Sequence, residues 1–241
     1  MRLLVRTWNV FHGNAHPPRR AGFLRRMIEL ATADQPDVVC LQELPVWGLQ
    51  RLEGWSGMQS VGAVARPAIR PGLVTAWITG LNQGLFRSGI AGQANAVLVD
   101  RRHGAADLGG AQISAPGLER RIVHAVRVLP DGADTASLVV GNLHASNVFH
   151  DPDVPRAEVE RARAFVEGKA APGEAIALAG DFNVADPRLA GYSPPGAGID
   201  DVLVRGAVVR EMTVWALERR MQDGLVLSDH APVDCVLEVG A

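Results

Sequence analysis

Short apolar runs bounded by turn residues make up much of the chain, and they predict a protein rich in β-strands. Most of these runs end close to Gly, Pro, Asn or Asp, which favour turns. The sequence Pro130-Asp131-Gly132 predicts a hairpin between two of them. The expected strands are Leu3–Asn9, Val38–Gln42, Ser60–Ala65, Ala94–Asp100, Ala111–Ser114, Leu118–Leu129, Ser137–Leu143, Ala175–Ala179, Asp201–Val204, Ala207–Trp215 and Ala231–Val239.

Apolar residues recur at helical spacing in four other segments. We expect helices over Arg19–Ala33, Val46–Leu52, Gly72–Phe86 and Asp153–Val166. The Gly72–Phe86 segment is amphipathic, so it either covers the core or contacts a partner or a lipid, and base rates favour the core. Because the chain opens as strand, helix and strand, we expect its first two strands to be parallel neighbours.

The composition is that of an ordinary soluble protein, with 47% hydrophobic and 21% charged residues. The length of 241 residues suits one α/β unit, and we expect residues 1–241 to form a single, monomeric domain. No apolar run is long enough to span a bilayer. The N-terminus resembles a strand more than a signal peptide, and the sequence leaves open whether a leader has already been removed. Cys40 and Cys235 lie in apolar runs; we expect them to be buried and unpaired, which favours a cytoplasmic location.

The formal net charge of −2 gives no overall field that would attract a polyanion. Lys169 is the only lysine, so nearly all positive side chains are arginines, whose guanidinium groups suit phosphate. A solvated surface is the commoner explanation for any single arginine pair. The pairs are Arg19–Arg20, Arg25–Arg26, Arg101–Arg102, Arg120–Arg121 and Arg219–Arg220.

Five apolar runs border abruptly on polar residues that can bind metal or phosphate. They are Trp8-Asn9, Leu41–Glu43, Gly141–His144, Gly180–Asn183 and Ser228–His230. Strands that end this way place carboxylates and imidazoles together at the rim of a sheet. Close carboxylates repel one another unless a cation lies between them, and oxygen ligands prefer Mg²⁺ or Mn²⁺. The pattern therefore predicts a site where a divalent ion assists attack on a phosphate ester.

In combination and order, these segments resemble the endonuclease/exonuclease/phosphatase superfamily of deoxyribonuclease I-like phosphoesterases. The matching stretches, from residue 7 to residue 233, are TWNV, DVVCLQEL, NAVL, NLHAS, GDFNV, IDDVLV and SDHAPV. The resemblance implies an α/β fold, a four-layer α/β sandwich in which two mixed β-sheets pack face to face with helices outside. It also implies hydrolysis of a phosphate ester that depends on Mg²⁺ or Mn²⁺.

The resemblance further implies catalytic roles for five residues. Asp181 matches the residue that orients or deprotonates the attacking water, and Asn183 matches its partner in holding the phosphate or nucleophile. His230 matches the histidine that contacts the scissile phosphate, and Asp200 matches the carboxylate that orients this imidazole. His144 matches a histidine placed over the phosphate or the leaving group.

Metal and substrate roles follow in the same way. Glu43 matches the main metal ligand, with Asn9 beside it and Asp229 as a further carboxylate of the metal site. Asn95 occupies the place of an asparagine found before a strand in many members, and Arg19–Arg20 are expected near the substrate. His12, His16, His103 and His150 are expected in loops and His124 in a structural role, with His12 and His150 the best further candidates for the site.

The substrate is the least determined part. A nuclease that cleaves phosphodiesters in DNA or RNA is the first hypothesis, although the slight negative charge and the few aromatic residues argue against it. A phosphatase or phosphodiesterase for a small-molecule or lipid phosphate is the second, with Gly72–Phe86 closing over the head group. A non-catalytic binding module is a remote third, opposed by the intact acids and histidines.

Overall fold

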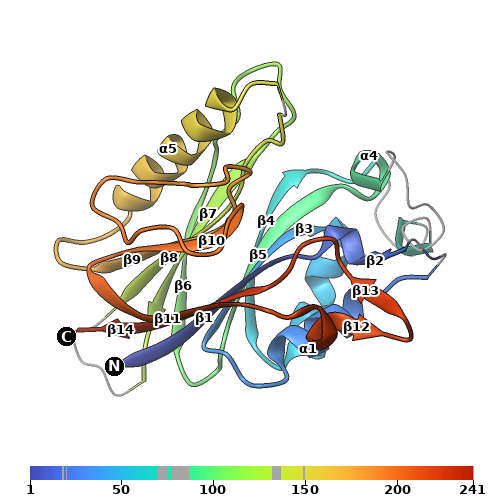
Figure 1. Ribbon diagram of the computed structural model, residues 1–241, viewed down its shortest axis with the longest axis horizontal. Helices are drawn as coiled ribbons and strands as arrows, with labels where there is room; N and C mark the ends of the chain where they lie inside the picture. Colours follow the sequence, from blue (N-terminus) through green and yellow to red (C-terminus); the bar gives the residue numbers. More distant parts are fainter. Residues whose placement is uncertain are drawn as a thin grey trace.

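The computed structural model describes residues 1–17, 19, 21–69, 75–77, 87–131, 137–148 and 150–240 (Figure 1). Arg20, Gly132 and most of the expected helix Gly72–Phe86 lie outside the described residues. Within these ranges, no helix has both the length and the apolar character that crossing a membrane requires.

One sheet has six strands in the order β11-β14-β1-β3-β5-β4. Their bounds are β11 (Ala207–Val214), β14 (Val233–Val239), β1 (Arg2–Asn9), β3 (Val38–Leu44), β5 (Gln93–Val99) and β4 (Gln59–Arg66). Strands β1 and β3 are parallel, as the opening strand–helix–strand pattern predicted, and the other neighbours are antiparallel. Helix α1 (Leu24–Thr32) connects the parallel pair.

The second sheet has five strands in the order β10-β9-β8-β7-β6. Their bounds are β10 (Asp200–Arg205), β9 (Ala175–Asp181), β8 (Leu138–His144), β7 (Ile122–Leu129) and β6 (Gly104–Gln112). Strands β8 and β9 are parallel and are connected through α5 (Asp153–Glu167), while β7 and β8 are antiparallel, as the predicted hairpin requires. The sequence therefore predicted the first parallel pair and the helix α5, while the parallel pairing of β8 and β9 is a finding of the structure.

The main core lies between the two sheets and is built from valine, leucine, alanine and the two cysteines. Cys40 and Cys235 are buried and free, as predicted. A second apolar cluster joins the six-stranded sheet to α1 and α2 (Leu52–Ser56), and a third joins the five-stranded sheet to α5. Helices thus cover the outer faces of both sheets (Figure 1), and the four-layer α/β sandwich is confirmed.

Several predicted boundaries were wrong. The helix expected over Arg19–Ala33 begins only at Leu24, and the strand expected over Leu118–Leu129 begins at Ile122. The short strand expected over Ala111–Ser114 is the end of the much longer β6. The sequence of β6, GAADLGGAQ, lacks an apolar alternation because its residues are small, so its pairing with β7 is what defines it.

The remaining elements are short. The helix expected over Val46–Leu52 is the 3-10 helix η2, which α2 follows, and the others carry no periodicity that a sequence pattern can reveal. Strands β12, β13 and β2 form a three-stranded sheet, part of which lies in the segment after His12 that was expected to be a loop. These elements are β2 (Ala15–His16), β12 (Met221–Gln222), β13 (Leu225–Leu227), α4 (Arg87–Ala91), η1 (Phe11–Gly13), η2 (Val46–Arg51) and η3 (Leu217–Arg220).

Candidate active site

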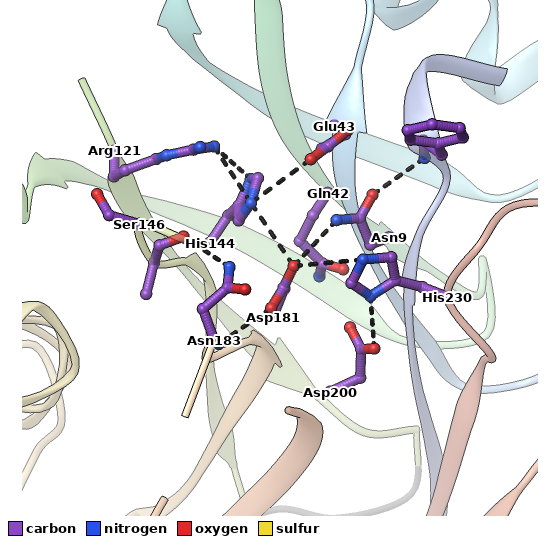
Figure 2. Close-up of polar contacts among 12 residues, drawn as sticks. Asn9, Gln42, Glu43, Arg121, His144, Ser146, Asp181, Asn183, Asp200 and His230 are labelled. Carbon is purple, nitrogen blue, oxygen red and sulfur yellow. Dashed lines mark hydrogen bonds and ion pairs between the residues drawn. The ribbon is translucent and has the colours of Figure 1, made fainter. Parts of the chain in front are cut away.

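The strand register brings three of the predicted residues together at one end of the strands of the five-stranded sheet. His144 lies opposite Asp181 in the β8–β9 pair, and Asp200 lies opposite Asp181 in the β10–β9 pair. From the other sheet, the Asn9 side-chain Nδ2 donates a 3.0 Å hydrogen bond to Asp181 Oδ2 (Figure 2). Asp181 is therefore held between the ends of both sheets and is only 1% exposed.

Glu43 reaches the same place through an irregularity in β3. The register between β3 and β5 shifts between Leu41 and Leu44, and Glu43 has a left-handed backbone with φ 54°. Bulges of this kind redirect a side chain, and they are frequent next to active sites. As a result, Glu43 Oε1 lies 3.6 Å from His144 Nε2, and Glu43 Oε2 lies 3.5 Å from His12 Nε2.

The Gly180–Asn183 motif owes its residues to backbone geometry. Gly180 has φ 146°, and a Cβ at this position would lie 2.0 Å from the carbonyl oxygen of Leu143, so only glycine fits. Asn183, with φ 48°, donates its backbone N–H to Asp181 Oδ1 at 3.0 Å and its side-chain amide to Ala145 O at 2.9 Å. The motif thus fixes the Asp181 carboxylate through a residue only two positions away in the sequence.

His230 and Asp200 form a hydrogen-bonded pair, with 2.7 Å between His230 Nδ1 and Asp200 Oδ2. The preceding loop is held by Ser228, whose hydroxyl donates to Asn9 O at 2.7 Å and accepts from His230 N at 3.1 Å. The other ring nitrogen, Nε2, lies 3.9 Å from Asp181 Oδ2. The imidazole therefore presents Nε2 to the interior of the site and is oriented by Asp200.

The pKa values of these groups are shifted by one another. Burial alone would lower the pKa of His230, but the hydrogen bond and charge of Asp200, together with the charge of Asp181, outweigh it and raise the pKa to about 9. Burial raises the pKa of Asp181 to about 7, and the charges of Asp200 and Glu43 act in the same direction. Burial also raises the pKa of Glu43, against the charge of Arg121. His230 is consequently cationic at neutral pH.

His144 has the opposite protonation state. Gln93 Nε2 lies 3.0 Å from its Nδ1, and Arg121 Nη1 lies 3.0 and 3.1 Å from its two ring nitrogens, so this guanidinium nitrogen sits over the ring face. Because the Gln93 amide donates to Nδ1, we assign the ring proton to Nε2, which faces Glu43 Oε1 and Asp181 Oδ2 at 3.6 Å each. Burial lowers the pKa of His144 well below its ordinary value, and the charges of Arg121 and His230 add to this effect.

The acidic groups fit a hard divalent cation. Among the described residues, Asp181, Asp200 and His230 each place one ligand atom within 4.8 Å of the others. His230 Nδ1 is engaged with Asp200, so Nε2 is the only ring nitrogen of this residue that faces the cluster, 3.9 Å from Asp181 Oδ2. Glu43 and Asp181 form a second pair of candidate ligands, because Glu43 Oε1 and Asp181 Oδ2 each lie 3.6 Å from His144 Nε2 and so face the same space.

Seven of the predicted residues thus come together: Asn9, Glu43, His144, Asp181, Asn183, Asp200 and His230 (Figure 2). Asp229 is exposed but close enough for its charge to act on Glu43 and His230, and Arg19 is also exposed. Asn95 is buried and donates to Ile122 O at 3.4 Å, which links the two sheets. Arg20 is outside the described residues, so its predicted role has no structural counterpart.

Two residues near the acids, Gln93 and Arg121, had no site role assigned from the sequence, and a third, His12, was expected only as a further candidate. His12 follows the first strand, and Arg121 belongs to an arginine pair, so each carried a weak signal. Gln93, which contacts His144, carried none. Two other histidines pair with acids elsewhere, His103 with Asp37 at 2.7 Å and His124 with Asp107 at 2.9 Å, and both pairs link neighbouring segments of the fold.

Two kinds of match relate this chain to known proteins. The model of the Endonuclease/Exonuclease/phosphatase family matches residues 7–230, whereas no curated protein matches the chain. The fold is similar to that of a humanized D. rerio TDP2 with 14 mutations, with a TM-score of 0.68 and 16% identity over 98% of this chain and 99% of that chain. An endonuclease/exonuclease/phosphatase from Beutenbergia cavernae DSM 12333 has a TM-score of 0.66 and 20% identity over 100% and 72% of the two chains.

A family protein from Bacteroides thetaiotaomicron is also similar, with a TM-score of 0.69 and 15% identity over 99% of this chain and 98% of that one. Identities at this level show a common fold. The family match is separate evidence because it runs from the end of the first strand to His230 and so includes every residue of the assembled site. On that match, this chain belongs to the endonuclease/exonuclease/phosphatase family.

Proposed function

We propose that this protein is a divalent-metal-dependent phosphoesterase that hydrolyses a phosphodiester, with nucleic acid as the first substrate to test. The observation that carries the proposal is the arrangement around Asp181. This buried carboxylate accepts hydrogen bonds from Asn9 and Asn183, and the cationic His230 lies 3.9 Å away. A base, an acid and fixed donors around one point are what hydrolysis of a phosphate ester requires.

In this mechanism Asp181 accepts a proton from the attacking water. Burial and the neighbouring charges of Asp200 and Glu43 raise the pKa of this carboxylate, which favours proton acceptance, and Asn9 and Asn183 keep it in place. The P–O bond to the leaving group breaks as the bond to the water oxygen forms, and the leaving oxygen takes a proton from solvent. His230, kept protonated by Asp200, donates a hydrogen bond to the phosphoryl oxygen whose negative charge grows.

Glu43, with Asn9 and Asp181 beside it, is the group we expect to hold Mg²⁺ or Mn²⁺. When bound, such an ion polarises a phosphoryl oxygen and favours deprotonation of water. Arg121 lies over His144 and its side chain is 11% exposed. It can therefore contribute a second positive charge, beside that of His230, to the binding of the phosphate. Guanidinium groups recognise phosphate oxygens, and this residue accordingly joins the proposed substrate contacts.

A phosphate ester of a small molecule or lipid is the second candidate substrate. The formal net charge of −2 supports it, because a long nucleic acid gains nothing from the overall field of this protein. The two candidates predict different results in one activity panel. Its substrates are plasmid, single-stranded DNA, RNA, bis-p-nitrophenyl phosphate and p-nitrophenyl phosphate, each with Mg²⁺, Mn²⁺ or EDTA.

Nicking of plasmid or cleavage of single strands at catalytic enzyme concentrations supports the nuclease, whereas turnover confined to the small esters supports the second candidate. Asp181→Asn and His230→Gln should each abolish metal-dependent turnover without unfolding the protein. Asp186→Asn is a matched control, because Asp186 is an exposed acid that pairs with Arg188. No turnover of any substrate by the wild-type protein, or normal rates in the Asp181 and His230 variants, would refute the proposal.

A further inference from the structure

A cavity of about 140 Å³ lies beside the candidate active site, on the side where Glu43 enters it. We call it the tryptophan pocket. Its lining residues are His12, Gly22, Leu24, Arg25, Trp47, Trp55 and Ala76. Neither the catalytic roles assigned above nor the proposed metal ligands use this space, although it adjoins both.

The walls of the pocket are aromatic and only partly covered by the rest of the protein. Trp47 and Trp55 meet edge to face, with ring centroids 6.1 Å apart and an angle of 80° between their planes. Both rings pack against the apolar cluster that contains Leu24, yet both keep an intermediate exposure. Two tryptophans fixed at such an angle offer flat apolar surfaces on which another ring can stack.

His12 is the wall that the pocket shares with the active site. It lines the cavity, and its Nε2 lies 3.5 Å from Glu43 Oε2. Phe11, His12 and Gly13 have successive positive φ values of 45°, 52° and 78°, a conformation that non-glycine residues adopt at a cost. This turn places the imidazole in the wall of the pocket and against Glu43, so a group in the pocket lies beside a ring that contacts one of the acids.

We propose that the tryptophan pocket binds a flat ring carried by an ester group of the scissile phosphate, of the size of a phenyl or pyrimidine ring. The volume supports this size, because an apolar cavity of about 150 Å³ is enough to hold benzene. The inference rests on the proposed function, since the phosphate must lie at Asp181 and Glu43 for its ester group to reach the pocket. The ring can come from an aryl ester or from a nucleobase.

The test compares three phosphate monoesters that differ only in the organic group: phenyl phosphate, methyl phosphate and thymidine 5′-monophosphate. Their dissociation constants are measured by calorimetry with Mn²⁺ present, so the readout does not depend on turnover. Stacking on aromatic side chains contributes about 1–3 kcal/mol per ring, so we expect phenyl phosphate to bind roughly ten-fold more tightly than methyl phosphate. Equal gains for thymidine 5′-monophosphate identify a nucleobase as the natural ring, and a gain for phenyl alone identifies an aryl ester.

The decisive test is a variant that adds a side chain at the lining of the pocket. Gly22 lines the pocket and a Cβ added there meets no atom within 4 Å, so Gly22→Leu adds apolar bulk at the lining without a clash. Gly54→Leu is the matched control, because Gly54 is also exposed with no atom within 4 Å of a Cβ but does not line the cavity. Trp47→Leu is a second variant that keeps an apolar side chain and removes the flat face.

The preference is the ratio of the dissociation constants of methyl phosphate and phenyl phosphate. We expect Gly22→Leu and Trp47→Leu to reduce this ratio below about three-fold, and Gly54→Leu to retain it in full. A wild-type preference below about three-fold, or an unchanged preference in Gly22→Leu, overturns the proposal. Hydrolysis of bis-p-nitrophenyl phosphate is measured in parallel. Turnover without ring preference refutes only the pocket, and ring preference without turnover refutes only the proposed hydrolysis.

Discussion

The two site histidines differ in protonation because their neighbours differ. His230 has a carboxylate at 2.7 Å from Nδ1, whereas the ring of His144 is covered by the Arg121 guanidinium. A negative neighbour stabilises the protonated imidazole and a positive neighbour destabilises it, so one ring becomes a cation and the other stays neutral. The neutral His144 can then lie within 3.6 Å of Glu43 and Asp181 without competing with a metal ion for their charge.

Replacing Asp200 by asparagine should lower the pKa of His230. The ring is expected to stay protonated up to about pH 9 in the wild-type protein, because Asp200 accepts its Nδ1–H and contributes a charge. Loss of a neighbouring carboxylate charge shifts a pKa by about 1–3 units, so in Asp200→Asn the proton should leave at a correspondingly lower pH. NMR titration of the histidine ring in EDTA measures this, with Asp186→Asn as control. An unchanged His230 pKa would contradict the assigned orientation.

Replacing Arg121 by glutamine should have two effects in one variant. The pKa of His144 should rise, because the Arg121 charge is one of the causes that lower it. Turnover of bis-p-nitrophenyl phosphate should fall by about 10²-fold, the usual effect of removing a donor that faces the developing charge. The adjacent Arg120, which donates to Ala65 O at 3.3 Å, provides the control variant Arg120→Gln. Normal turnover in Arg121→Gln would remove this residue from the proposed substrate contacts.

At the scale of elements, the close approach of β8 and β9 depends on Gly180. Gly180→Ala would place a Cβ 2.0 Å from Leu143 O in a backbone with φ 146°, so the strands must separate between His144 and Asp181. We expect a loss of about 3 kcal/mol or more in the free energy of unfolding, measured by urea denaturation. Gly173→Ala is the control, because Gly173 also has a positive φ of 84° but no atom within 4 Å of a Cβ. Its cost should be about 1–2 kcal/mol, and equal costs in both variants would show that the strand contact is unimportant.

Strand ends were predictable from the sequence because apolar runs there meet charged residues. This signal located Asp181, His144 and Asn9, and their convergence was expected because strands that end in this way place their polar residues together at the rim of a sheet. The residues at which helices and strands begin were harder to predict from the sequence. Arg121 was expected inside a strand from Leu118, but β7 begins at Ile122, which leaves Arg121 before the strand and able to fold back over His144. No periodicity reports a contact of this kind, which depends on the turn that precedes the strand.

At the scale of the whole molecule, the site is a junction between the two sheets. Glu43 and Asn9 belong to the six-stranded sheet, whereas Asp181 belongs to the five-stranded one. Beneath them, Gln42 donates to Asn142 Oδ1 at 2.8 Å, and Asn142 donates to backbone carbonyls of the opposite sheet at 2.8 and 3.0 Å. These buried polar contacts fix how the sheets align, and the acids of the two sheets meet because of that alignment.

A cation shared by Glu43 and Asp181 would therefore link the sheets and stabilise the whole fold. At a concentration of Mn²⁺ or Mg²⁺ of about 100 times the dissociation constant, binding to the folded state alone adds about 2.7 kcal/mol to the free energy of unfolding. The melting temperature should rise with metal and return with EDTA, and Glu43→Gln should abolish the rise at the same metal concentration. Glu53→Gln is the control, because Glu53 is exposed and pairs with Arg101. A metal-dependent rise that persists in Glu43→Gln would mean that the ion binds elsewhere, and the junction would then be held by its hydrogen bonds alone.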